Sequence, residues 1–214
     1  MGMRGVMFDA GGVLFGPIGG RWNPRFDFER IVARHYPGVG SFAAAIAVGQ
    51  RFLDKSSTTP PRGEYHRVML DVLGVEPSAS LLAELDAPLA EPVVEVYPDV
   101  RPALERLRLG GVRMSVVSDS WAGLVTLLES LDLAGYFDGF AISEVLGCNK
   151  PDPRMYAEGQ RLLGLPADEC LFIDDDPLLV QAARELGHQG LTLDRGASLS
   201  SEGVIASLDA LAVP

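Results

Sequence analysis

Three short, largely apolar runs in this sequence each end abruptly at a polar residue. The runs are Val6–Phe8, Val112–Val117 and Cys170–Ile173, and the residues that follow them are Asp9, Ser118 and Asp174. Segments with the apolar spacing of helices separate the runs. Strands that alternate with helices of about ten residues predict a parallel sheet with helices on both faces. Since the carboxyl ends of parallel strands meet at one edge, where open α/β sheets bind ligands, we expect the three polar residues to converge there.

After the first strand the pattern changes to a purely helical one. Apolar stripes start at Phe28 and Phe42, a third follows Pro60-Pro61, and Leu81, Leu82 and Leu85 indicate a fourth. The sequence therefore predicts two domains. Residues 1–16 and 92–214 form an α/β core with a Rossmann-like parallel sheet, and residues 17–91 form an inserted helical subdomain.

Near the carboxyl end, the pattern predicts a last strand at Gly190–Leu193 and a last helix at Val204–Leu211.

The composition excludes several classes of function. A net charge of −11 over 214 residues argues against binding to nucleic acid or to an anionic membrane surface. No apolar run approaches the roughly 18 residues of a membrane span, and Asp9 interrupts the apolar stretch that a signal peptide needs. Cys148 and Cys170 are too few for a disulfide framework. We therefore expect a cytoplasmic protein, monomeric or homodimeric, without nucleic-acid or membrane partners.

The polar residues at the predicted sheet edge have complementary chemistry. Carboxylates such as Asp9, Asp174 and Asp175 can hold Mg²⁺ together with substrate phosphate oxygens. Ser118 can donate a hydrogen bond to a phosphoryl oxygen, Lys150 supplies positive charge, and an aspartate can attack phosphorus. This set of groups favours phosphoryl transfer. Two simpler roles stay open, because Asp174 can orient Lys150 and Asp176 before Pro177 is typical of a helix N-cap.

These motifs, in this order, resemble the haloacid dehalogenase-like (HAD) hydrolase superfamily over nearly the whole chain. Asp9-Ala10-Gly11-Gly12-Val13-Leu14 resembles its first motif, Ser118 its second, Lys150 before Pro151-Asp152-Pro153 its third, and Phe172-Ile173-Asp174-Asp175 its fourth. The predicted helical subdomain is similar to the four-helix cap of that superfamily. The resemblance implies a Mg²⁺-dependent phosphatase that acts on a small phosphorylated metabolite through an aspartyl-phosphate intermediate.

The resemblance also implies a role for each site residue. The implied catalytic residues are Asp9 (the nucleophile), Ser118 and Lys150; the implied substrate-binding residues are Gly11, Gly12, Ser118, Asp119 and Lys150; and the implied metal ligands are Asp9, the backbone carbonyl of Gly11, Asp174 and Asp175.

Two positions depart from the pattern of that superfamily. Its phosphatases usually carry a second aspartate, the general acid and base, two residues after the nucleophile, and this chain has Gly11 there. Leu179, which fits an apolar helix stripe, stands where the superfamily commonly has Asp or Asn. General acid catalysis contributes about 10²–10⁴-fold to a rate. The alternative function is therefore a catalytically degenerate protein of the same fold that binds a ligand or a partner.

Other classes of protein fit the sequence less well. In a bacterial receiver domain the acidic pair comes before the acceptor aspartate, which is the reverse of the order here. A haloacid dehalogenase needs neither Mg²⁺ nor the acidic pair Asp174-Asp175. A P-loop nucleotide enzyme requires a G-x-x-x-x-G-K-[ST] motif, which this sequence lacks.

Overall fold

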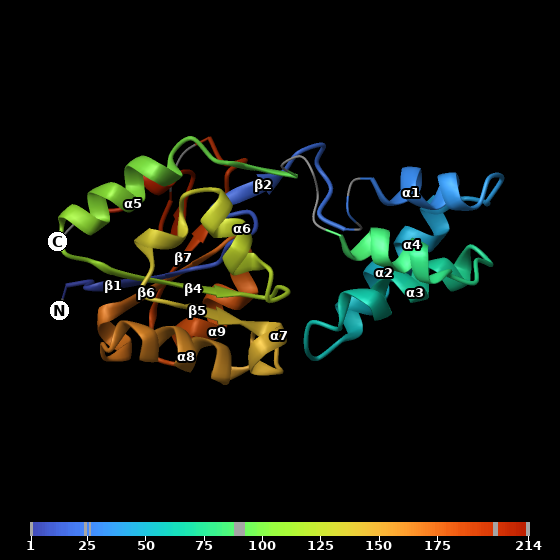
Figure 1. The fold of residues 1–214 in the computed structure, drawn as a ribbon. Coiled ribbons are helices and arrows are strands. Elements are labelled where there is room, and N and C mark those ends of the chain that lie inside the picture. Colours follow the sequence, from blue (N-terminus) through green and yellow to red (C-terminus); the bar gives the residue numbers. More distant parts are fainter. Residues whose placement is uncertain (1, 24, 26, 88–92, 199–200, 213–214) are drawn as a thin grey trace. The chain divides into compact units, whose positions relative to one another are not determined.

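The computed structural model describes residues 2–23, 25, 27–87, 93–198 and 201–212. The chain forms two compact units (Figure 1). The core unit comprises Met1–Gly16 and Val96–Pro214, and the helical unit comprises Pro17–Glu95. The predicted boundary between residues 91 and 92 lies outside the described residues.

The core unit is built on a parallel sheet. Among the described residues this sheet has six strands in the order β5-β4-β1-β6-β7-β8. The strands are β1 (Gly5–Phe8), β4 (Arg113–Ser118), β5 (Phe140–Ile142), β6 (Cys170–Asp174), β7 (Gln189–Leu193) and β8 (Val204–Ile205). Phe8 pairs with Val116 of β4 on one side and with Ile173 of β6 on the other. The register therefore puts Asp9 between the carboxyl ends of its two neighbouring strands, and the predicted Rossmann-like fold is confirmed.

Helices cover both faces of this sheet. On one face α8 (Pro153–Leu163) and α9 (Pro177–Glu185) pack on the strands, with Tyr156 and Val180 in one apolar cluster with Met7, Val117 and Phe172. On the other face lie α5 (Val100–Leu109) and α6 (Leu124–Ser130) (Figure 1). Among the described residues, every helix is too short or too polar to cross a bilayer.

The predicted helix at Val204–Leu211 is wrong. Val204 and Ile205 form the edge strand β8, which pairs in parallel with Thr192 and Leu193 of β7, and only Leu208–Ala210 make a 3₁₀ turn, η3. A short apolar run fits a helix and a strand equally well. The open edge of β7 supplies hydrogen-bond partners for this segment, and that tertiary contact is absent from a local sequence pattern.

The helical unit contains the four predicted helices. They are α1 (Phe28–His35), α2 (Phe42–Lys55), α3 (Arg62–Val72) and α4 (Ala79–Asp86). Helix α2 packs on α3, and α1 packs on α4. Two short strands that the sequence pattern did not reveal, β2 (Phe15–Pro17) and β3 (Val94–Val96), form a separate two-stranded sheet where the chain passes between the units. The short helix α7 (Ser143–Leu146) of the core unit was also not predicted.

The core of the helical unit holds a histidine. The side chain of His66 on α3 is 2% exposed and stacks on the Phe28 ring with 5.9 Å between the ring centroids. Its Nδ1 atom lies 3.8 Å from Oδ1 of Asp86. Burial lowers the pKa of His66 to about 4, against a weaker opposing effect of Asp86. The ring is therefore neutral in the folded protein near pH 7.

This histidine should make the protein less stable in acid. As the pH falls from about 6.5 to about 4, the unfolded chain gains a proton that folded His66 does not bind, so the free energy of unfolding decreases by roughly 3 kcal/mol in all. Urea unfolding at several pH values should show this loss, and His66→Phe should remove most of it. An unchanged pH dependence in His66→Phe would contradict the assignment.

Candidate active site

A buried lysine joins two aspartates at the carboxyl edge of the core sheet. Nζ of Lys150 lies 2.7 Å from Oδ1 of Asp9 and 2.6 Å from Oδ2 of Asp174. The side chains of Lys150 and Asp174 are each 2% exposed, and that of Asp9 is 11% exposed. Charged groups are rarely buried unless they are paired. The close contacts supply that pairing and draw together residues that are 141 and 24 positions apart in sequence.

Backbone hydrogen bonds fix the three side chains from different elements. Asp9 directly follows β1, and its N–H donates to the carbonyl of Ile173 at 2.9 Å. Asp174 ends β6, and its Oδ1 accepts the N–H of Asp176 at 2.9 Å. Lys150 lies in the loop between α7 and α8, where its N–H donates to Oδ1 of Asp119 at 2.8 Å. Each charged group is therefore held by the sheet or by a loop at the sheet edge.

The charges at this site change the ionisation of its members. Burial raises the pKa of Asp9 to about 7; Lys150 opposes this effect, and the negative charges of Asp174 and Asp175 add to it. Burial acts against the charge of Lys150, but Asp9, Asp174 and Asp119 outweigh it and raise the lysine pKa. Burial and then Asp174 also raise the pKa of Asp175. The site thus has more acidic groups than its single lysine neutralises.

An excess of carboxylates suits a divalent cation. Asp9, Asp174 and Asp175 each offer an oxygen, and these atoms lie within 4.8 Å of one another. Mg²⁺ binds oxygen at about 2.0–2.1 Å, so ligands on opposite sides of it are roughly 4.2 Å apart, a spacing comparable with that of these atoms. A cation there would also relieve the repulsion that adds to burial in raising the pKa values of Asp9 and Asp175. The residues present therefore fit Mg²⁺.

Glycine is required where the backbone passes this cluster. Gly12 has a φ of 77°, and a Cβ atom there would overlap the carboxylate of Asp175. The backbone of the loop and that carboxylate are thus packed against each other. Gly11, the preceding residue, makes an isolated bridge with Phe15 as the chain turns back.

Three other residues singled out in the sequence lie at or near the same edge of the sheet or in the helix after β6. Ser118 is the buried last residue of β4, the strand next to β1. Asp176 caps α9, with Oδ1 accepting the N–H of Leu178 at 2.8 Å, as its N-cap pattern predicted. Leu179 packs against the apolar cluster on this face, so its position serves the core. These contacts establish which groups meet, and the catalytic and ligand roles of the groups stay predictions.

Two residues make contacts at this site that the sequence pattern did not predict. The Phe172 ring lies 5.6 Å from Nζ of Lys150, a distance suited to a cation–π contact. Arg195, which follows β7, donates hydrogen bonds to the carbonyls of Gly12 and Val13 in the turn after Asp9. The pattern around Phe172 indicates only a buried strand, and a single arginine after a strand has no distinctive pattern.

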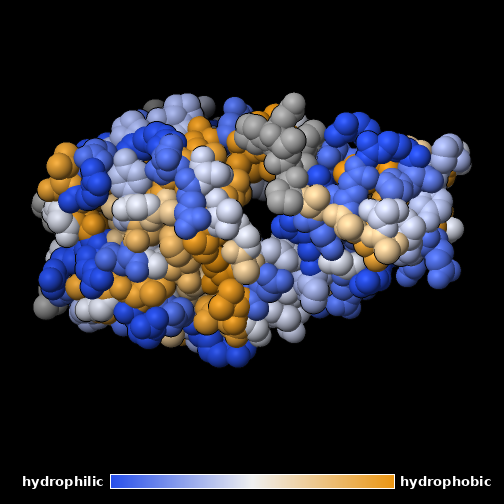
Figure 2. Space-filling view, viewed as in Figure 1, coloured by the Kyte–Doolittle hydropathy of each residue, from blue (hydrophilic) through white to orange (hydrophobic). Residues whose placement is uncertain are grey.

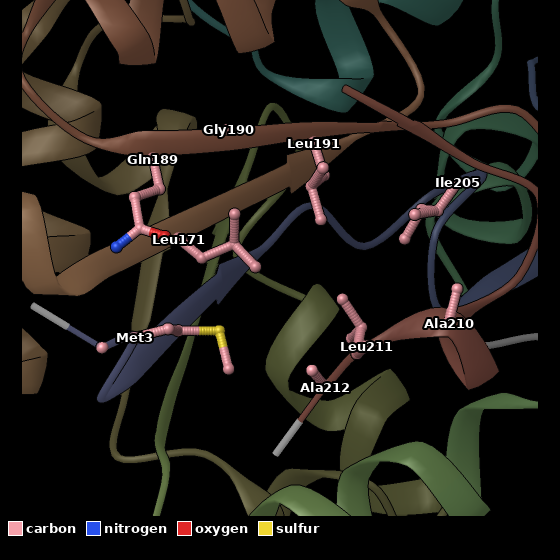
Figure 3. A pocket seen from close by; sticks show the side chains of 10 residues that line it. Met3, Leu171, Gln189, Gly190, Leu191, Ile205, Ala210, Leu211 and Ala212 are labelled. Carbon is pink, nitrogen blue, oxygen red and sulfur yellow. The ribbon is translucent and has the colours of Figure 1, made fainter. Parts of the chain in front are cut away.

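A separate pocket of about 490 Å³ lies in the core unit away from this edge (Figure 3). Its walls come from the residues before β1 and from β6, β7, β8 and the segment after η3, and they include Met3, Leu171, Gln189, Ile205 and Leu211. None of its lining residues is titratable. On the visible face of the core unit, apolar patches are interspersed with polar surface (Figure 2). Among the described residues, the cluster around Lys150 is therefore the better candidate for chemistry.

Comparisons with known proteins agree with this fold. A family model described as haloacid dehalogenase-like hydrolase matches residues 3–187. A phosphatase of Mycobacterium tuberculosis is 34% identical over 117 residues, which are 54% of this chain and 54% of that protein. A glyceraldehyde 3-phosphate phosphatase of Methanopyrus kandleri is 30% identical over 118 residues, 50% of this chain and 48% of that protein. The chain thus spans about half the length of these curated relatives.

A solved structure extends the likeness in fold to most of the chain. The L-2-haloacid dehalogenase of Xanthobacter autotrophicus matches with a TM-score of 0.64 and 22% identity, covering 92% of this chain and 79% of that one. At that identity the match concerns the fold alone, because one fold carries several chemistries.

Proposed function

The chain belongs to the haloacid dehalogenase-like hydrolase family, and we propose that it is a Mg²⁺-dependent phosphatase of a small phosphorylated metabolite. The observation that carries this proposal is the buried contact of Lys150 with Asp9 and Asp174 at the carboxyl edge of the sheet. Asp175 lies beside them. The phosphatase names of both curated relatives support the same reaction class.

Asp9 is the proposed nucleophile. Its carboxylate oxygen forms a bond to phosphorus as the bond from phosphorus to the leaving oxygen breaks, which gives an aspartyl-phosphate. Water then attacks this intermediate, releases inorganic phosphate and restores the carboxylate. Lys150 favours the ionised form of Asp9 and offsets negative charge that the phosphoryl group brings. Ser118, at the end of the adjacent strand, is assigned a hydrogen bond to a phosphoryl oxygen.

The proposed ligands of Mg²⁺ are Asp9, Asp175 and the backbone carbonyl of Gly11. Both carboxylate oxygens of Asp174 already have partners, Lys150 and the N–H of Asp176, which favours a role in orienting the lysine. When bound, the ion supplies charge neutralisation for the phosphoryl oxygens.

The substrate class follows from what the site lacks. Gly11 cannot donate a proton to the leaving group, so a substrate whose leaving group departs easily, or carries its own proton, is favoured over a simple alkyl phosphate. The Methanopyrus relative is named for a small sugar phosphate, which supports a metabolite of that size.

Phosphate release from a panel of phosphorylated metabolites, with and without Mg²⁺, tests this proposal. We expect at least one Mg²⁺-dependent substrate for the wild-type protein and none for Asp9→Asn. Glycine in place of the acid at position 11 favours one second candidate, a ligand-binding protein without turnover. Thermal stabilisation by Mg²⁺ and beryllofluoride without hydrolysis of any ester would contradict the phosphatase and support that candidate.

Restoring the missing acid should raise the activity. Gly11→Asp is expected to increase kcat/KM for alkyl phosphates by about tenfold or more, toward the 10²–10⁴-fold range of general acid catalysis. An aryl phosphate should gain less, because its leaving group needs no proton. Gly11→Asn is the matched control, with similar size and no acidic proton. No gain in a folded Gly11→Asp variant would show that the leaving group obtains its proton elsewhere.

A further inference from the structure

One guanidinium group, that of Arg195, donates two hydrogen bonds to the turn after Asp9. Nε of Arg195 donates to the carbonyl of Gly12 at 3.1 Å, and Nη2 donates to the carbonyl of Val13 at 2.6 Å. We call residues 9–15 the Asp9 loop. Within it, the N–H of Gly12 donates to Phe15 and the N–H of Leu14 donates to Ala10. These internal bonds shape the turn. At its ends, Asp9 bonds to Ile173 and Lys150, and the carbonyl of Leu14 accepts the N–H of Tyr97. Between these ends, Arg195 ties the carbonyls of Gly12 and Val13 to a distant part of the chain.

Arg195 is itself fixed in place. Nη1 lies 3.0 and 3.1 Å from the two carboxylate oxygens of Asp99, and the guanidinium carbon lies 3.8 Å from the centre of the Tyr97 ring. Asp99 in turn accepts hydrogen bonds from the hydroxyl of Ser207 at 2.9 Å and the N–H of Leu208 at 2.8 Å. The side chain of Arg195 is 22% exposed and that of Asp99 is 9% exposed. The planar guanidinium group of Arg195 thus bonds to the loop carbonyls and to the Asp99 carboxylate at the same time. The ammonium group of a lysine cannot reproduce this geometry.

The position of the Asp9 loop decides the position of the site. The backbone at Gly12 packs directly against the Asp175 carboxylate, and Asp9 begins the same loop. A shift of the Gly12 carbonyl therefore moves the loop relative to both acids. Displacements of about 1 Å at a reacting centre can cost 10²-fold in rate.

We propose that Arg195, clamped by Asp99, is a positioning residue that holds the Asp9 loop in its catalytic geometry. This proposal rests on the proposed phosphatase function. Arg195 acts through the loop backbone, because its guanidinium group bonds to the carbonyls of Gly12 and Val13. Its other described hydrogen-bond partner is Asp99, and its described partners do not include Asp9, Lys150, Asp174 or Asp175.

Kinetics of three variants separate this role from simple stabilisation. Arg195→Met should lower kcat by about 10–100-fold with KM within about threefold of wild type. Arg195→Lys keeps a positive charge opposite Asp99, so it should recover thermal stability without recovering kcat. Arg106→Met is the matched control, because Arg106 bonds to the carbonyl of Leu208 at 3.1 Å and does not contact the loop. Its kcat should stay at the wild-type value. Recovery of kcat by Arg195→Lys would overturn the proposal.

A second measurement is independent of activity. Hydrogen–deuterium exchange of a peptide covering residues 9–16 should be faster in Arg195→Met and Arg195→Lys than in the wild type and Arg106→Met. Unchanged exchange in Arg195→Met would overturn the proposal, whether or not a substrate is known. Faster exchange in a protein that hydrolyses no phosphate ester would support the clamp on the loop and contradict the proposed function alone.

Discussion

Replacing Asp9 by asparagine is expected to lower kcat for phosphate ester hydrolysis by at least about 10⁴-fold, as loss of a catalytic nucleophile does in other hydrolases. The introduced amide would keep an oxygen for Lys150, but an amide is too weak a nucleophile to attack phosphorus. Initial rates at saturating substrate and Mg²⁺ measure the effect. The matched control is Asp176→Asn, since asparagine also caps helices well and Asp176 serves as the cap of α9. That variant should keep its activity within about threefold.

The Asp9→Asn variant should not be less stable than the wild type. The pKa of Asp9 in the folded protein is about 7, above its ordinary value of 3.8, so this group lowers the stability as the pH rises from about 3.8 to about 7, and the loss is complete above that pH. In EDTA at a pH above that value, Asp9→Asn should therefore unfold at the same or a higher temperature. A lower unfolding temperature would contradict this account of the ionisation of Asp9, and retained activity in a folded Asp9→Asn protein would contradict its assignment as the nucleophile.

Replacing Lys150 by methionine is expected to affect both stability and rate. Methionine fills the space of the lysine stem but leaves Asp9 and Asp174 buried without a counter-charge. Breaking a buried ion pair from one side typically costs about 3–5 kcal/mol. Removing one charge-stabilising group from an active site also costs roughly 10²–10³-fold in rate. Chemical unfolding and initial rates at matched protein concentration measure the two effects.

The pH dependence and a second substitution show whether unpaired charge or lost packing causes the destabilisation by Lys150→Met. The destabilisation by Lys150→Met should be larger above about pH 7 than in mild acid, because protonation of the carboxylates removes the unpaired charge. The double variant Asp9→Asn/Lys150→Met loses one acid together with the lysine and should be more stable than Lys150→Met alone. Equal destabilisation at all pH values, with no recovery in the double variant, would show that lost packing is the cause.

Much of the core fold could be predicted because its strands are buried on both faces. The runs at Val6–Phe8 and Cys170–Ile173 are continuous apolar segments, and each forms a central strand of the sheet. The segment at Val204 was misassigned because it is short and lies at the sheet edge, where pairing with β7 decides its conformation. The strands β2 and β3 have three residues each, too few to show a periodicity.

The polar cluster could be anticipated only in part. Asp9, Ser118 and Asp174 each follow an apolar run, so the parallel sheet brings them to one edge. Lys150 lies in a loop, and nothing in its local pattern shows that its side chain is buried between two aspartates. Arg195 and Asp99 depend on a contact across 96 residues of sequence, which is invisible to any local pattern.

Chemical trapping at Asp9 is the most direct test of the proposed mechanism. Reaction mixtures of the wild-type protein, Mg²⁺ and a turned-over phosphate ester can be quenched with tritiated borohydride, which reduces an acyl phosphate to an alcohol and leaves a free carboxylate unchanged. We expect tritium in the peptide that contains Asp9 and none in the Asp9→Asn protein. Turnover of the substrate without label at Asp9, or with label at another acidic residue, would contradict the account.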